Sequence, residues 1–412
     1  MRIEKASHGG TMVKVLLGVL AAAVVFVLGL ASGAGIMWLV GAGGATSKGG
    51  QSAQVASWSD RAQLLGDIRE ILQDEYIEPA ALDDQKMIYG AAAAMVAAVG
   101  DPHTAFVEPA AAAIIDEDMQ GSFEGIGATV DMVDGQVVIV RPLPGSPAEQ
   151  AGIKAGDVIL AADDSPLEGM SLTDAITLIR GPRGSKVALL IQREGVAEPF
   201  VIEVVRDRIE LETVEYRMLD DGIAYVRLAE FNAVAGDKLD EALKELLAQN
   251  PKGLILDLRD NPGGYLHIAV DVAGQFLERN TLILTERLRD QPDQEFRVRG
   301  AGRATQVPLA VLVNGGSASA SEIVAGAVQD HARGTLVGET TFGKGSVQQT
   351  HTLSDGSSLR VTIARWLLPG GRNLDGDGIV PDVQVDYTAE DFEAGRDPQL
   401  DAARDLLLSQ GP

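Results

Sequence analysis

The sequence has no cysteine among its 412 residues, which excludes disulfides, thiolate metal sites, iron–sulfur clusters and a cysteine nucleophile. It has only 5 histidines, and their spacing matches no metal-ligand motif such as H-E-x-x-H. Basic residues are also few, since 34 Lys+Arg stand against 59 Asp+Glu for a net charge of −25. Such an acidic chain is a poor nucleic-acid binder. Any chemistry must therefore use side chains other than cysteine.

Length and composition indicate a globular protein of more than one domain. Hydrophobic residues make up 46% and charged residues 23% of the chain, which is usual for proteins with a buried core. At roughly 150 residues per domain, the length predicts two or three domains.

One long apolar run lies near the N-terminus. Residues 15–40 carry no charge, and a helix of that length can span a bilayer. The short tail 1–14 holds three basic residues against one glutamate, so the positive-inside rule keeps it in the cytoplasm. We predict a transmembrane signal anchor with the rest of the chain on the periplasmic side of a bacterial inner membrane. The alternative is a signal peptide cleaved near 31–33, which would release the protein into the periplasm.

Changes in composition and periodicity divide the remaining chain. Apolar residues recur at helical spacing from about 58 to 99, short β-type runs begin near 119, and strands alternate with helices from about 225. We predict a linker at 41–56, a helical domain at 57–115, a small α/β module at 116–207, a larger α/β domain at 208–390 and a helical tail at 391–412.

Local signals support the small module. Asp134-Gly135 between two apolar runs predicts a two-residue hairpin. Ser146 is a candidate N-cap of a short helix that Gly152 would end. A second helix is expected over 171–180.

A glycine pair opens this module. In Gly125-Ile126-Gly127 the glycines allow backbone N–H groups to turn inward and hold a carboxylate, while the following strand pairs with an extended peptide. Together with 145–148, 151–159 and 181–184, this segment resembles a PDZ domain. The resemblance implies capture of protein C-termini, with Gly125, Ile126 and Gly127 as the carboxylate loop and the helix 171–180 beside the groove.

A serine-rich turn stands in the larger domain. Residues 311–322 run from a buried strand through a glycine corner into a helix, whose first N–H groups suit a negatively charged oxygen. Ser319 could serve there as a nucleophile or only cap the helix, because Glu322 completes a capping box. The residues themselves do not select among Ser317, Ser319 and Ser321.

A lysine between two glycines is the second chemical feature. Residues 338–344 resemble a nucleotide-binding P-loop, but Gly345 occupies the Ser/Thr position and 347–353 predicts a strand where a helix is required. We therefore reject a nucleotide site. Lys344 can act as a base only when neutral, and burial would have to bring its pKa from about 10.4 to near neutrality, at a cost of roughly 4 kcal/mol.

These segments, with the Asp257–Gly264 stretch, resemble the signatures of the carboxyl-terminal processing peptidases, the S41 serine proteases, over about three quarters of the chain. The resemblance implies a multidomain α/β (α+β) protein with a crotonase/ClpP-like protease core. It assigns the nucleophile to Ser319, the base to Lys344 and the orientation of the lysine to Gln348. The oxyanion hole would use the backbone N–H groups of Ala320 and of Gly263 or Gly264. It further suggests a homo-oligomer and an activating adaptor protein, and no cofactor or metal.

Two motifs have alternative interpretations. His103 is interpreted as a polar turn residue, although a Ser-His-Asp triad stays open from spacing alone. A calcium loop starting at Asn373 lacks the closing glutamate because position 12 is Gln384, so we favour a structural turn.

We therefore predict a membrane-anchored serine endopeptidase that binds unstructured C-termini of envelope proteins and cleaves them with a Ser-Lys dyad. The alternative is a non-catalytic PDZ scaffold that binds the same C-termini without cutting.

Overall fold

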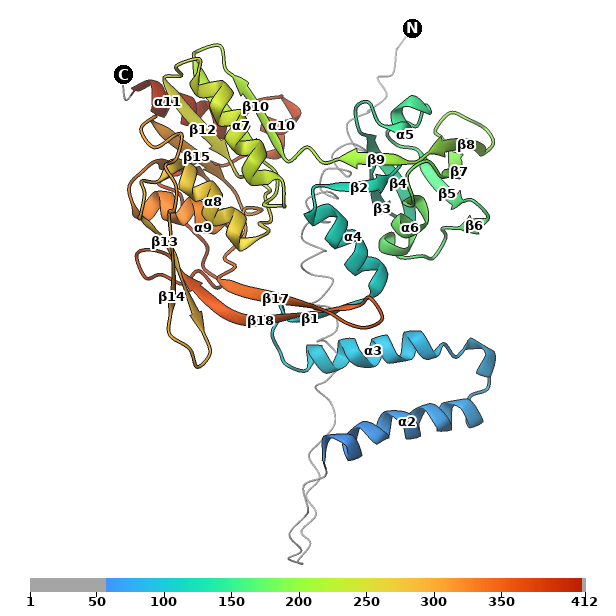
Figure 1. Cartoon of the computed structure of the whole chain (residues 1–412). Coiled ribbons are helices and arrows are strands. Elements are labelled where there is room, and N and C mark those ends of the chain that lie inside the picture. The colour runs from blue at the N-terminus through green and yellow to red at the C-terminus, as the bar shows by residue number, and fades with distance from the viewer. Residues whose placement is uncertain (1–56, 410–412) are drawn as a thin grey trace, which may run out of the picture.

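A computed structural model describes residues 57–409 of the chain. The predicted tail 1–14, anchor 15–40 and linker 41–56 lie outside the described residues. Between residues 57 and 409, no helix combines the length and the apolar character needed to cross a bilayer. Figure 1 shows a large α/β body, a smaller β-rich module joined to it by an extended segment on one side and a helix on the other, and a pair of helices at the lower end.

The body is built on a six-stranded sheet. Its strand order is β10-β11-β12-β15-β16-β19, with the first pair antiparallel and all later neighbours parallel. The central strands β12 and β15 are buried along their whole length, as expected when helices cover both faces of a sheet. The strands are β10 (Val214–Met218), β11 (Ile223–Leu228), β12 (Gly253–Asp257), β15 (Leu309–Val313), β16 (Thr335–Gly338) and β19 (Val383–Gln384).

Helices cover the two faces of this sheet unequally. α7 (Ala235–Leu247), α8 (Leu266–Phe276) and α9 (Ala320–Asp330) share the larger core, whereas α11 (Pro398–Ser409) packs on the other face. The short α10 (Ala389–Glu393) precedes α11. α9 is buried on all sides through most of its length, because it lies between the sheet and a second layer of strands.

A second, antiparallel sheet completes the body. It runs in the order β1-β18-β13-β14, and β17 also pairs with β18. The β17–β18 ribbon reaches from the body toward the N-terminal helices (Figure 1). The strands are β1 (Ala105–Val107), β13 (Leu282–Leu288), β14 (Gln294–Arg297), β17 (Ser346–Thr352) and β18 (Ser358–Leu367). β17 confirms the strand predicted after Lys344, so the nucleotide loop remains rejected.

The N-terminal segment is helical but also contributes β1 to the body. It contains α2 (Trp58–Glu75), the 3-10 turn η1 (Pro79–Ala81), α3 (Asp84–Ala97) and α4 (Pro109–Met119). β1 pairs with β18, so Ala105 lies opposite Arg360. α4 runs without a break across residues 115 and 116, where we predict the boundary between the helical domain and the small module.

The small module has a sheet of order β3-β4-β5-β7-β8, with β6 paired to β5, around its own core. Its strands are β3 (Ala128–Val133), β4 (Gln136–Pro142), β5 (Val158–Ala162), β6 (Ser165–Pro166), β7 (Lys186–Gln192) and β8 (Phe200–Val205). Its helices are α5 (Pro147–Gln150) and α6 (Leu172–Ile179). β2 (Ser122–Gly125) pairs with β9 (Asp207–Glu210), so the entry and exit of the module lie side by side.

The predicted turns and caps of the module are confirmed. Asp134 and Gly135 have φ of 51° and 76° in the hairpin between β3 and β4. The Ser146 hydroxyl accepts the N–H of Glu149 at 3.2 Å, and Gly152 ends the helix with a φ of 82°.

Candidate active site

Three loops that carry predicted site residues meet at one edge of the central sheet. β12, β15 and β16 are parallel neighbours, and the segments that follow their carboxyl ends carry Gly263, Ser319 and Lys344. Because carboxyl ends of parallel strands open at the same edge, residues more than 80 positions apart along the sequence share one site. The topology therefore assembles the predicted catalytic residues.

The turn between β15 and α9 distinguishes the three serines. The hydroxyls of Ser317 and Ser321 are buried and donate to the carbonyls of Leu258 and Asn261, at 2.8 and 2.9 Å. Both hydroxyls are therefore structural. Ser319 is partly exposed and has a φ of 54°, a strained conformation for a residue with a side chain. The geometry thus leaves Ser319 as the candidate nucleophile, a choice that the sequence did not allow.

Glu322 joins the serine turn to the lysine loop. Its fully buried carboxylate accepts the backbone N–H groups of Ser319 and Lys344 on the same oxygen, at 2.8 and 2.9 Å. The other oxygen accepts the Thr341 hydroxyl at 2.6 Å and the Gly343 N–H at 2.7 Å. Four donors therefore converge on one side chain. The sequence predicted Glu322 only as a capping residue.

The lysine loop depends on its glycines. A Cβ at Gly343 would lie 2.8 Å from the Gly378 nitrogen, and one at Gly345 would lie 2.8 Å from Asn373 Oδ1. The turn that begins at Asn373, considered above as a calcium loop, packs directly on this segment. Asp375 accepts the Gly345 N–H at 2.8 Å, so its carboxylate supports the lysine loop.

The electrostatic environment favours a neutral lysine. Burial lowers the pKa of Lys344, and the nearby positive charge of Arg360 lowers it further, while Glu322 and Asp101 oppose the shift. Arg360 has a buried Nε without a hydrogen-bond partner among the described residues. The direction of the shift is the one that a lysine base requires.

Gln348 lies in β17, four residues after Lys344. Its amide nitrogen donates to the hydroxyls of Ser346 and Thr362, at 2.9 and 3.1 Å. These two bonds use the donor end of the amide and leave its oxygen as the acceptor for an ammonium or amine hydrogen.

The turn after α3 also reaches the site. The Thr362 N–H donates to the Thr104 hydroxyl, which donates to Asp101 at 2.6 Å. Asp101 also accepts the N–H of His103, which confirms the predicted polar turn. Burial and the charge of Lys344 lower the pKa of His103. Sequence reasoning missed this proximity because it follows from the pairing of β1 with β18.

The predicted oxyanion donors lie against the serine. A Cβ at Gly263 would be 2.9 Å from the Ala320 nitrogen. Ala320 opens α9, where the helix provides no carbonyl for its N–H. The Gly263 N–H donates to Asn261 Oδ1 at 2.9 Å, so it is occupied in this arrangement. Gly264, with a φ of 142°, packs on the backbone of Phe231.

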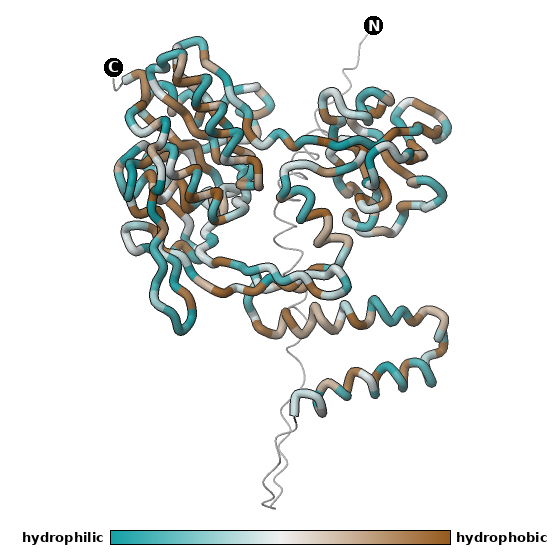
Figure 2. Tube along the Cα trace, in the orientation of Figure 1, coloured by the Kyte–Doolittle hydropathy of each residue, from teal (hydrophilic) through white to brown (hydrophobic). Residues whose placement is uncertain are grey.

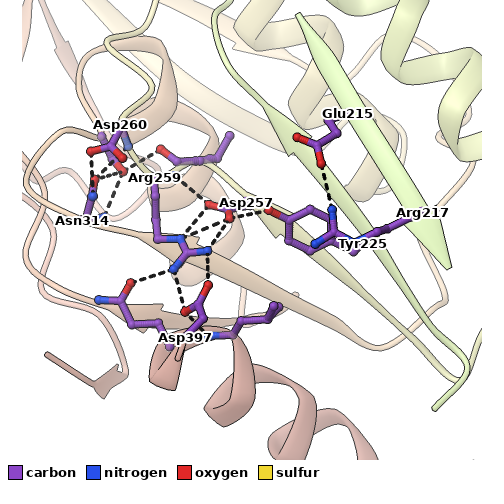
Figure 3. A network of polar contacts seen from close by, with 12 residues as sticks. Glu215, Arg217, Tyr225, Asp257, Arg259, Asp260, Asn314 and Asp397 are labelled. Carbon is purple, nitrogen blue, oxygen red and sulfur yellow. Dashed lines mark hydrogen bonds and ion pairs between the residues drawn. The ribbon is translucent and has the colours of Figure 1, made fainter. Parts of the chain in front are cut away.

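Arg259 anchors the glycine loop (Figure 3). Its guanidinium binds Asp257 at the end of β12 and Asp397 just before α11, with shortest contacts of 2.7 and 2.9 Å. Asp260 and Asn314 exchange two hydrogen bonds of 2.9 Å, which tie this loop to the serine turn. The network holds two of the three loops in fixed register.

The predicted peptide-binding loop lines a large cleft. Ile126 and Gly127 border it together with Ile176 and Ile179 of α6, and its volume is about 1010 Å³. The cleft continues past these residues to Pro262 in the glycine loop. The cleft therefore extends from the predicted peptide groove to the glycine loop that lies against Ser319.

This arrangement defines a class of protein, a serine peptidase with a peptide-binding module. Residues 222–385 match peptidase family S41, and residues 138–193 match the PDZ domain. A "Carboxy-terminal-processing protease" of Bartonella bacilliformis is 37% identical over 340 residues, covering 82% of this chain and 77% of that protein. A "Carboxyl-terminal-processing protease" of Synechocystis sp. is 37% identical over 346 residues, covering 82% and 80%.

A solved structure also resembles the chain. The putative S41 protease from Bacteroides fragilis has a TM-score of 0.53 at 18% identity, covering 84% of this chain and 97% of that one, which supports the fold. The chain belongs to peptidase family S41. It is a serine-type endopeptidase of the carboxyl-terminal processing kind, and the alternative of a non-catalytic PDZ scaffold is set aside.

Proposed function

We propose that Ser319 attacks the scissile carbonyl after neutral Lys344 takes its hydroxyl proton, with the Gln348 oxygen orienting the amine. The observation that carries this assignment is the Glu322 oxygen shared by the N–H groups of Ser319 and Lys344. The lowered pKa of Lys344 supports it as well.

The proposed reaction proceeds in two halves. Attack gives a tetrahedral intermediate whose oxyanion accepts the Ala320 N–H. Its collapse passes the proton from Lys344 to the departing amine and leaves an acyl group on Ser319. Water then attacks this ester, with Lys344 again as base, and releases the new carboxyl terminus.

Substrate capture is assigned to the PDZ module. Gly125, Ile126 and Gly127 would hold the terminal carboxylate, and the peptide would continue along the cleft beside α6. Buried Ile126 and a φ of 74° at Gly127 support a preformed loop, because a Cβ at Gly127 would lie 2.5 Å from that of Ser146.

The test is cleavage of an unfolded protein that ends in an apolar residue. The full-length enzyme is expected to release fragments that mass spectrometry maps, whereas Ser319→Ala should bind the same substrate without cutting it. Removing the substrate's last three residues should raise KM more than it lowers kcat. Equal cleavage by Ser319→Ala would refute the proposed nucleophile.

We further propose that 15–40 anchors the protein in a bacterial inner membrane with the peptidase in the periplasm. The uncharged run and the basic tail before it support this location. In spheroplasts, added protease should digest residues 57–409, and the anchor should remain in the membrane after alkaline extraction. Protection of the peptidase domain in intact spheroplasts would contradict the location.

Self-association through α2 is a further part of the proposal. All described side chains of α2 are exposed except half-buried Leu72, and Leu64, Ile68 and Ile71 form an apolar stripe with exposures of 60%, 45% and 57%. Figure 2 shows such apolar positions on α2, which lies away from the body. A lone helix of this length is marginally stable in water. We therefore propose that the apolar stripe of α2 packs against a second copy of the chain.

Changing Leu64 and Ile68 to glutamate is expected to convert a dimer or larger oligomer into a monomer. Light scattering on the detergent-solubilised full chain measures the mass. A matched double variant, Gln63→Glu with Gln73→Glu, adds the same charge elsewhere on α2 and should keep the wild-type mass. A monomeric wild type at micromolar concentration would disprove this assembly.

A further inference from the structure

The cleft between the PDZ module and the body has two unlike walls. Ile126, Ile176 and Ile179 form the apolar wall on the PDZ side. The opposite wall consists of β10, β11, the start of α7 and Pro262. Pro262 precedes Gly263, whose added Cβ would lie 2.8 Å from the Cβ of Ser319, so a peptide that runs from the PDZ groove to Ser319 would pass along this second wall.

Glu230 stands on the second wall, next to the active-site loop. It follows β11 and immediately precedes Phe231, whose N–H donates to the Gly263 carbonyl at 2.8 Å. The Phe231 carbonyl in turn accepts the Tyr265 N–H at 2.8 Å. Glu230 therefore lines the cleft one residue away from the backbone bonds that hold the glycine loop.

The Glu230 carboxylate lacks a counter-charge. Among residues 57–409 it makes no hydrogen bond or ion pair. The charge that acts on it is that of Asp118, a like charge that is itself paired with Arg180 at 2.9 Å. Lys238, another cation of the cleft, donates to the Leu211 carbonyl instead. Burial raises the pKa of Glu230 to about 7, and the charge of Asp118 adds to the effect.

We propose that Glu230 selects a basic residue, lysine or arginine, in the substrate segment between the PDZ-bound C-terminus and the scissile bond. This inference rests on the proposed function, because it requires the peptide to run from the PDZ groove to Ser319. A cationic side chain supplies the charge that the carboxylate lacks, a neutral polar residue supplies only a hydrogen bond, and an acidic residue is repelled.

The preference has a definite pH dependence. A carboxyl with a raised pKa is ionised only above that pKa, so selection of a cation is present above about pH 7 and fades below it. The other ionisable groups of the surroundings are Asp118 on α4, Arg141 on β4, Arg180 after α6, Glu210 on β9, Glu212 before β10, Glu215 and Tyr216 on β10, Arg227 on β11, Lys238 and Glu241 on α7, and Tyr265. Burial raises the pKa of Tyr265 further from neutrality, so its hydroxyl stays uncharged between pH 6 and 8.5.

The experiment uses the full-length enzyme and fluorogenic peptides with an apolar C-terminus. A single lysine is moved one position at a time through the segment before the terminus, and each peptide is paired with one that has glutamine or glutamate there. At pH 8.5, lysine at one or two positions should raise kcat/KM about tenfold over glutamine. At pH 6 the same ratio should approach one.

Variants assign the effect to Glu230. Glu230→Gln should bring the lysine-to-glutamine ratio near one at both pH values, and Glu230→Lys should favour glutamate at the same position. The control Glu198→Gln removes an exposed charge of the PDZ module outside the cleft and should keep the tenfold ratio.

Two different failures are distinguishable. If the wild type cuts every peptide with a lysine-to-glutamine ratio below two, or if Glu230→Gln keeps the tenfold ratio, the role of Glu230 is disproved and the peptidase assignment stands. If the wild type cuts no peptide, or if Ser319→Ala cuts them equally well, the proposed function itself fails.

Discussion

Replacing Lys344 with methionine is expected to lower kcat/KM by at least about 10⁴-fold, because the change removes the group proposed to take the Ser319 proton. Folding should survive. The pKa of Lys344 is lowered in the folded protein, so the unfolded chain binds more protons between that pKa and the ordinary value. Burying Lys344 therefore lowers the free energy of unfolding at neutral pH, and the methionine variant should be at least as stable as the wild type.

The pH profile tests the same assignment. Because the base must be neutral, kcat/KM should rise with pH through the lowered pKa of Lys344 and level off below 10.5. Thermal unfolding of Lys344→Met at pH 7 measures the stability, and Lys86→Met on the exposed face of α3 is the matched control. Full activity at neutral pH in an enzyme whose Lys344 amine titrates at or above 10.5 would contradict a lysine base.

Replacing Glu322 with glutamine is expected to reduce both stability and turnover. A glutamine would place an NH₂ group against two of the four donors that now converge on the carboxylate. Unsatisfied buried donors cost about 1–3 kcal/mol each, so we expect a loss of about 3 kcal/mol in the free energy of unfolding. Because the serine and lysine loops would separate, kcat should fall about 100-fold or more.

A shift in pH dependence distinguishes this role from a purely structural one. The Glu322 charge raises the pKa of Lys344, so its loss should move the pH profile of the residual activity to lower pH. Glu322→Asp keeps the charge but shortens the reach, and it should lose turnover with less displacement of the profile. As a control, Glu393→Gln on exposed α10 should change neither the turnover nor the pH profile. An unchanged pH profile in Glu322→Gln would refute the proposed effect of the Glu322 charge on the pKa of Lys344.

Local sequence signals predicted much of the secondary structure. The hairpin at Asp134-Gly135, the cap at Ser146 and the strand after Lys344 depend on neighbouring residues, so their physical causes are readable in a short window. The resemblance to S41 peptidases is confirmed by the family comparisons. The predicted boundary at 115/116 falls within α4, which continues there without a glycine or proline to stop it.

Other features required contacts between distant segments. The hydroxyls of Ser317 and Ser321 donate to the carbonyls of Leu258 and Asn261, about 60 positions away in the sequence. These long-range hydrogen bonds distinguish the two serines from Ser319. The convergence of the lysine loop on Glu322 and the approach of the 101–104 turn to Lys344 are likewise products of strand order.

The chain by itself determined its helices, turns, apolar faces and the two segments that carry a serine and a lysine, because these follow from residue types at short spacing. Only the tertiary structure decided which serine is available, which carboxylate joins it to the lysine and which carboxylate stands unpaired in the cleft. Hydrogen bonds and burial at those positions come from strands and loops that are neighbours in space and remote in sequence.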